Sequence, residues 1–139
     1  MDGDNSILRS VVLLRNAESK LKADSRVQLD TAALQSIQRD LSFALQGLTE
    51  SEVSDIFITG PIISACECIN VVTSDTGAVT DTETKLIIET KVSEALSRLY
   101  RYAGEYYTTH PFNYSVRLMS ILKEIINECL DQGYYFGLR

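Results

Sequence analysis

The chain has 139 residues, of which 45% are hydrophobic and 23% charged, and its 13 basic and 19 acidic side chains give a formal net charge of −6. A chain of this length can bury about 68% of its unfolded surface, so we predict a single domain over residues 1–139 that needs no metal or disulfide to fold. The acidic balance argues against nucleic acid as a partner, because phosphate-binding proteins usually present a basic face.

We expect neither a targeting signal nor membrane insertion. Asp2 and Asp4 occupy the start of the chain, where a secretory signal would carry positive charge. The longest uncharged apolar run, Ile56 to Cys66, is interrupted by Gly60-Pro61 and is shorter than the roughly 20 residues that span a bilayer. Three cysteines, an odd number, indicate buried free thiols in a reducing compartment. The sequence therefore predicts a cytoplasmic protein.

The first 50 residues predict two amphipathic helices. Apolar residues repeat at helical spacing over Ser6–Lys22. The β-branched residues at the start of this segment are also compatible with a strand, but the pattern continues through Leu21, which favours a helix. Asp30 or Thr31 is the expected N-cap of a second helix that ends at Gly47.

Residues 49–80 combine helix and strand signals. The segment Thr49-Glu50-Ser51-Glu52 has the form of a capping box and predicts a short helix through Ile58, which Gly60-Pro61 stops. The next element, Pro61–Val72, begins with a proline that suits the first helical position, but its β-branched residues favour a strand. Helix and strand are therefore both open over residues 53–72. The residues Thr73–Thr80 predict a loop.

The clearest helical periodicity lies in residues 86–130. A first helix should start at Asp81 or Thr82 and end before His110-Pro111, because proline disfavours helical backbone in the residue that precedes it. The second helix is apolar around much of its circumference, so we expect it to be buried on two sides, with Gly133 at its C′ position. It is then either a central helix of the bundle or one that packs partly on another subunit. The fold class that follows is an all-α bundle of five or six helices with a long C-terminal αα-hairpin.

The large apolar and aromatic side chains of this hairpin are the candidate interface. All seven tyrosines lie at position 100 or beyond. Aromatic residues at helical spacing usually belong to a core or to a protein interface, and such anchors carry much of the binding energy of interfaces. The residues that we expect to contact a partner are Leu99, Tyr102, Tyr106, Tyr107, Met119, Leu122 and Ile126.

The sequence predicts no catalytic, metal or cofactor site. Cys66-Glu67-Cys68 offers two thiols, and only Cys129 and His110 remain to complete the four ligands that a zinc site needs. The single histidine accompanies no G-x-S-x-G nucleophile elbow, and the seven glycines form no phosphate-binding loop. We therefore expect neither enzymatic activity nor a cofactor.

Residues 88–126 carry a recognisable order of motifs. Ile88-Glu-Thr-Lys91 and Glu94-Ala95-Leu96 are followed by a Tyr106-Tyr107 pair, by His110-Pro111 and by a second apolar helix. This order resembles a helical hairpin of the ImpA/TssA-type proteins of type VI secretion. Lys91 stands in place of the family's arginine, and the chain departs from the family pattern at His110, Asn113 and Tyr114. The matching residues are Thr90, Glu94, Ala95, Leu96, Tyr106, Tyr107 and Pro111.

The resemblance implies a cytoplasmic structural subunit, or an excised middle or C-terminal domain of one, that oligomerises and helps to assemble the secretion baseplate and contractile sheath. It implies no active site. The residues by themselves favour the same class, a homo-oligomer that also contacts other subunits of an assembly. The alternatives are a helical adaptor or viral or phage assembly factor that binds a partner helix in a groove, and a small enzyme or ligand carrier that uses the tyrosines of the hairpin.

Overall fold

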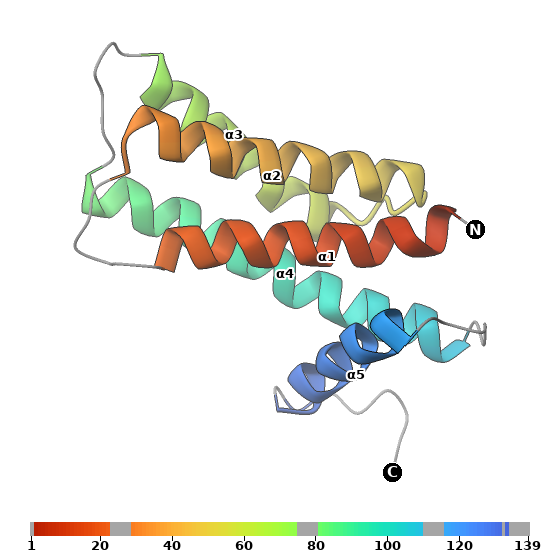
Figure 1. The fold of residues 1–139 in the computed structure, drawn as a ribbon. Helices are drawn as coiled ribbons and strands as arrows, with labels where there is room; N and C mark the ends of the chain where they lie inside the picture. Colours follow the sequence, from red (N-terminus) through yellow and green to blue (C-terminus); the bar gives the residue numbers. More distant parts are fainter. Residues whose placement is uncertain (1, 23–28, 75–80, 110–115, 132, 134–139) are drawn as a thin grey trace. The chain divides into compact units, whose positions relative to one another are not determined.

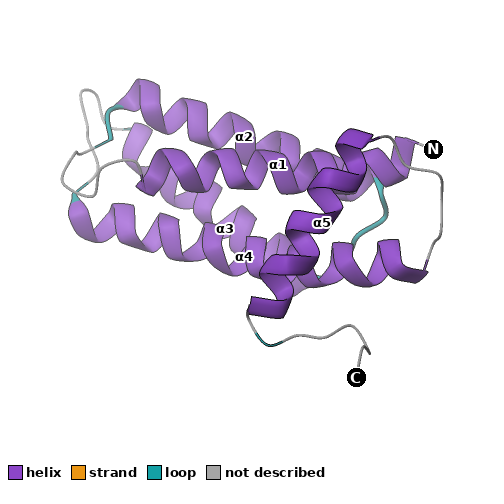
Figure 2. Cartoon of the chain, turned by 60° about the horizontal axis from the view of Figure 1, so that its bottom comes forward, coloured by secondary structure: helices purple, strands orange, loops and turns teal. Residues whose placement is uncertain are grey.

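The computed structural model describes residues 2–22, 29–74, 81–109, 116–131 and 133, and it contains five α-helices and no strand within these ranges (Figures 1 and 2). The helices are α1 (Asp2–Lys22), α2 (Thr31–Glu50), α3 (Ile56–Thr73), α4 (Thr82–Thr109) and α5 (Val116–Asp131). The predicted all-α helical bundle is confirmed. The strand that the sequence allowed within residues 53–72 is wrong, because this segment forms α3.

The chain groups into two compact units, Met1–Leu96 and Ser97–Arg139. The first unit contains α1, α2, α3 and the first half of α4, and the second contains the rest of α4 together with α5. Helix α4 is continuous across the boundary between them. That residues 1–139 fold as one domain stays a prediction.

Helices α1 and α2 lie side by side and run antiparallel (Figure 1). Their contact explains why α2 does not end at Gly47, as the sequence predicted, but continues to Glu50. Gly47 is buried where α1 comes closest, and a Cβ atom there would overlap Ser10 Oγ and lie 3.0 Å from the carbonyl oxygen of Ser6. Ser10 Oγ also donates a hydrogen bond of 2.8 Å to the carbonyl oxygen of Ala44. Glycine at position 47 therefore serves the close packing of two helices.

The predicted capping box at residues 49–52 is wrong. Thr49 lies within α2, where its hydroxyl donates to the carbonyl oxygen of Leu45 at 3.0 Å and so cannot cap a new helix. The chain reverses at Glu52, which has a φ of 59°. Helix α3 is capped instead by Asp55, whose Oδ1 accepts the Phe57 N–H at 2.9 Å. By contrast, the predicted cap of α2 at Asp30 is confirmed, since its Oδ1 accepts the Ala33 N–H at 2.8 Å.

Helix α3 continues through Gly60-Pro61, where the sequence predicted a break. Proline has no N–H for the carbonyl four residues earlier, and in a helix interior it costs about 3 kcal/mol. Each fully buried isoleucine stabilises the fold by about 1.5–3 kcal/mol, so the inner face of α3 outweighs this cost. The buried residues of that face are Ile58, Ile62, Ala65 and Ile69.

Among the helices that the structure describes, α3 is the one whose length and composition would allow it to cross a membrane, with a mean hydropathy of 1.6 over 18 residues. Core helices of soluble proteins pass the same test when they are mostly buried, whereas only 22% of this stretch of α3 is buried, although its inner face packs against α2. One such helix does not indicate a membrane protein. The cytoplasmic location stays a prediction.

The predicted ends of the last two helices agree with the structure where it describes them. Asp81 Oδ1 accepts the Thr84 N–H at 2.6 Å and caps α4, which ends at Thr109. Gly133 has a φ of 87°, and its N–H donates to the carbonyl oxygen of Leu130 at 2.9 Å, as expected for a C′ glycine. The connection at residues 110–115 and the aromatic residues 134–136 lie outside the described residues.

Candidate functional site

The second compact unit, Ser97–Arg139, holds all seven residues of the predicted interface. Within it α5 lies close to α4, since the charges of Arg101 and Glu105 on α4 act on the Cys129 thiol of α5. Burial raises the pKa of Cys129 to about 11, so this thiol stays protonated at neutral pH. Among the side chains of this unit that the structure describes, the buried ones are Leu99, Ala103 and Tyr107 on α4, and Leu122, Ile125 and Cys129 on α5.

Within this chain the described part of helix α5 buries one face, so it is not a central helix of the bundle, and its packing on another subunit stays a prediction. Its opposite face carries exposed polar residues at every turn that the structure describes. The apolar residues Ile121, Ile126 and Leu130 flank the buried face and are only half-buried, so they widen the apolar stripe without forming a second core. The exposed polar residues are Ser120, Lys123, Glu124, Asn127, Glu128 and Asp131.

The seven predicted interface residues fall into two groups. Leu99, Tyr107 and Leu122 are 0%, 4% and 8% exposed, so these side chains belong to the interior of this chain and have little surface left for a partner. The other four retain accessible surface. They are Tyr102, Tyr106 and Ile126, which are half-buried, and Met119, which is 50% exposed.

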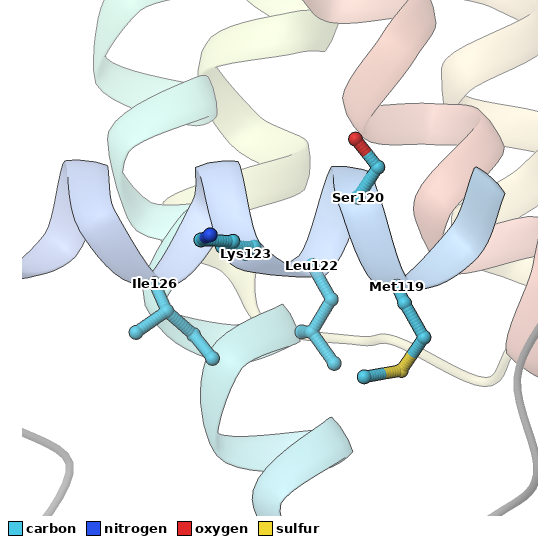
Figure 3. Close-up of a pocket in the computed structure, with 5 residues that line it drawn as sticks. All are labelled: Met119, Ser120, Leu122, Lys123 and Ile126. Carbon is cyan, nitrogen blue, oxygen red and sulfur yellow. The ribbon is translucent and has the colours of Figure 1, made fainter. Parts of the chain in front are cut away.

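An open hollow of about 490 Å³ follows one side of α5 (Figure 3). Met119, Leu122 and Ile126, spaced three and four residues apart, point to the same side of the helix (Figure 3), and Ser120 is the polar residue that lines the hollow beside them. Lys123 also lines the hollow and is exposed. The described part of this site is therefore an apolar strip with one cationic side chain beside it, a surface that suits the apolar face of another helix.

A second open hollow, of about 370 Å³, lies along the C-terminal end of α4. Its described lining consists of Tyr102, Glu105, Tyr106 and Thr109. The ring of Tyr106 meets that of the buried Tyr107 edge to face, with centroids 5.1 Å apart and an angle of 83° between the planes. This contact orients Tyr106, and pairs of this geometry contribute about 0.5–1.5 kcal/mol beyond their buried area.

The side chains that bind metals or act as nucleophiles in other proteins form no cluster among the described residues. Among the described residues, no three histidine, cysteine, aspartate or glutamate side chains come together as metal ligands would. Cys129 is buried as predicted, but Cys66 and Cys68 are only half-buried, and all three are free thiols. Burial also raises the pKa of Cys66. His110 lies outside the described residues.

Comparison of the chain with protein-family models, with curated proteins and with solved structures finds no match. The resemblance of residues 88–126 to the ImpA/TssA-type hairpin therefore remains an expectation that rests on the motifs alone.

One apolar surface was missed by the sequence analysis. It is the face of α3 turned away from the bundle, which we call the α3 outer face. Four large apolar side chains lie on it, and their exposed fractions are 71% for Ile56, 62% for Phe57, 46% for Ile63 and 70% for Val71. The spacing of these residues was visible in the sequence, but the predicted break at Gly60-Pro61 divided the helix on which they share a face.

Proposed function

We propose that this chain is a non-enzymatic assembly module that self-associates through the α4–α5 hairpin and also contacts other subunits of an assembly. The observation that supports this most is the strip on α5 where Met119 is half exposed beside the buried Leu122. Burying the exposed half of such a side chain contributes about 1 kcal/mol, and the unbranched methionine adapts to an incoming helix.

The partner surface that fits this strip is an amphipathic helix with apolar residues at positions i, i+3 or i+4, and i+7. Its ridge would contact Met119 and Ile126, with the largely buried Leu122 between them at the floor of the strip. Lys123 at the edge can pair with a carboxylate, and an acidic chain of net charge −6 supplies many of these. Such an exposed ion pair would guide orientation more than affinity, because it is worth about 1 kcal/mol or less.

The resemblance described above lies on this same hairpin. It leads us to propose a type VI secretion baseplate or sheath assembly subunit as the setting of this module. Genes for a contractile sheath next to the coding sequence would support that setting, and their absence from every genome that encodes the chain would count against it.

The test of self-association is Met119→Asp, because a carboxylate in the apolar strip would have to be desolvated on binding. Asn127→Asp, on the exposed face of α5, is the matched control. Light scattering coupled to gel filtration should show a concentration-dependent oligomer for the wild type and Asn127→Asp, and an association at least tenfold weaker for Met119→Asp. Circular dichroism checks that the fold is retained.

A second candidate function is a helical adaptor that binds a helix of another protein in the same strip. The strip with Lys123 at its edge fits an acidic amphipathic helix from either source. The adaptor would be monomeric at high micromolar concentration, whereas the assembly module would not. A monomeric wild type would therefore contradict the first proposal and leave the second.

A further inference from the structure

The two hollows of the hairpin carry charges of opposite sign. On α5, Lys123 lines the hollow beside the apolar strip, between Met119 and Ile126 along the chain. On α4, Glu105 lines the other hollow, between Tyr102 and Tyr106 along the chain. The described lining of each hollow therefore combines apolar or aromatic side chains with one charged group, which is a cation on α5 and a carboxylate on α4.

The ammonium group of Lys123 is available to a partner. The residue is exposed, and within the described part of the chain it makes no ion pair or hydrogen bond through its side chain. It can therefore bind a carboxylate of another molecule without first giving up a contact inside its own chain.

Glu105 differs from the other described carboxylates of the second unit in its surroundings. The others, which lie on the exposed polar face of α5, are Glu124, Glu128 and Asp131. Glu105 lies beside the half-buried rings of Tyr102 and Tyr106, and the face of a tyrosine ring attracts a cation. Glu105 also has a contact within its own chain, but a carboxylate can accept several hydrogen bonds, so a second donor can bind. This hollow therefore suits a cationic side chain.

From this arrangement we infer that Lys123 of one copy binds Glu105 of a second copy, with the apolar strip of α5 packed beside the tyrosines of the other copy's α4. The inference rests on the proposed function, because it names the surface that the α5 strip contacts in self-association. Both residues belong to the second unit, Ser97–Arg139, so a two-fold contact forms the pair twice.

The charges favour this contact over the two simpler ones. Lys123 lies near the middle of the strip, so a two-fold contact between two α5 strips would bring the two ammonium groups close together. A contact between two α4 hollows would do the same with the two Glu105 carboxylates. Like charges that meet in an interface are unfavourable, and opposite charges fix the register of the two partners. The contact of α5 with α4 is the one that joins opposite charges.

The test reverses each charge. Lys123→Glu and Glu105→Lys are prepared singly, together in one chain, and as an equal mixture of the two single variants, and sedimentation equilibrium measures the dissociation constant. Each single variant places like charges in both pairs of its dimer, so it should associate about tenfold more weakly than the wild type. The mixture and the double variant restore opposite charges in both pairs, so their affinity should return to within about threefold of the wild type.

Glu128→Lys is the matched control for Glu105→Lys, because it makes the same change of charge. Glu128 is exposed and follows Met119 by about two and a half helical turns, so it lies on the opposite side of α5. This variant should associate like the wild type and should not restore the affinity of Lys123→Glu on mixing. If circular dichroism shows that Glu105→Lys is unfolded, Glu105→Gln takes its place. Lys123→Gln should then have no further effect when Glu105→Gln is present.

The outcomes separate this inference from the proposed function. Association that Met119→Asp weakens, but in which the two charge reversals fail to restore each other, would overturn the inference and leave the proposed function standing. A wild type that is monomeric at high micromolar concentration would overturn both. Recovery on mixing that shrinks at about 1 M salt, where the screening length is about 3 Å, would support the ion pair.

Discussion

Gly47→Ala should destabilise the protein, although alanine is the better helix former. The gain in helix propensity is about 0.5–1 kcal/mol. Against it, the new methyl group would overlap Ser10 Oγ and crowd the Ser6 carbonyl oxygen at 3.0 Å, and overpacking of this kind costs about 1–3 kcal/mol. If Ser10 turns away, its buried 2.8 Å hydrogen bond to Ala44 is lost, at about 0.5–1.5 kcal/mol. The net loss should be about 1–3 kcal/mol.

Urea unfolding followed by circular dichroism measures this loss, at a protein concentration low enough to keep association out of the equilibrium. With a urea dependence of about 2 kcal/mol per molar, the midpoint should fall by about 1 M. Gly60→Ala is the control, because no atom outside its chain neighbours and its own helix backbone lies within 4 Å of the added carbon. The new Cβ precedes Pro61, which offsets the gain in helix propensity, so the midpoint should stay close to that of the wild type. Ser10→Ala should reduce the cost of Gly47→Ala by removing the overlapping oxygen. A midpoint for Gly47→Ala at or above that of the wild type would refute the reasoning.

Three further predictions concern single side chains. Pro61→Ala should stabilise α3 by about 1–2 kcal/mol in urea unfolding, since it restores an N–H within a continuous helix while making the unfolded chain more flexible; a loss of stability would contradict this account. The Thr84 N–H lowers the pKa of the Asp81 carboxyl below its usual 3.8, so its capping contribution is present above about pH 4 and is lost as the pH falls through the lowered value. Asp81→Ala should therefore flatten the acid side of the stability profile, and an unchanged profile would argue against the cap. Cys129, with a pKa of about 11, should resist thiol reagents at pH 8 until urea unfolds the chain, which counting of labelled thiols by mass spectrometry checks; rapid labelling of native Cys129 would show that it is accessible.

The features that were predicted correctly are those that depend only on residues nearby in the chain. Asp30, Asp81 and Gly133 take the capping roles expected of them, because a cap needs only a few residues on either side. Gly47 did not follow its local signal, since the reason for glycine there is the approach of α1, about 40 residues earlier in the chain. Pro61 likewise has a strong local effect that the burial of the inner face of α3 overrides.

The candidate interface was predictable only as a set of apolar residues. Periodicity places Leu99, Tyr107 and Leu122 on the same stripes as Tyr106 and Met119, and it does not distinguish a contact inside the chain from a contact between chains. Burial makes that distinction, with Leu122 at 8% exposed and Met119 at 50%. The α3 outer face escaped notice for a related reason, because its residues form one surface only if the helix passes unbroken through position 61.

The continuity of α4 determines how the protein can be divided. Both compact units include part of this helix, and the boundary between Leu96 and Ser97 falls inside its ladder of backbone hydrogen bonds. Cutting the gene at that boundary would remove from each fragment a stretch of helix on which its packing depends. Isolated halves are therefore poor substitutes for the whole chain, and the two surfaces are best studied by substitutions within it.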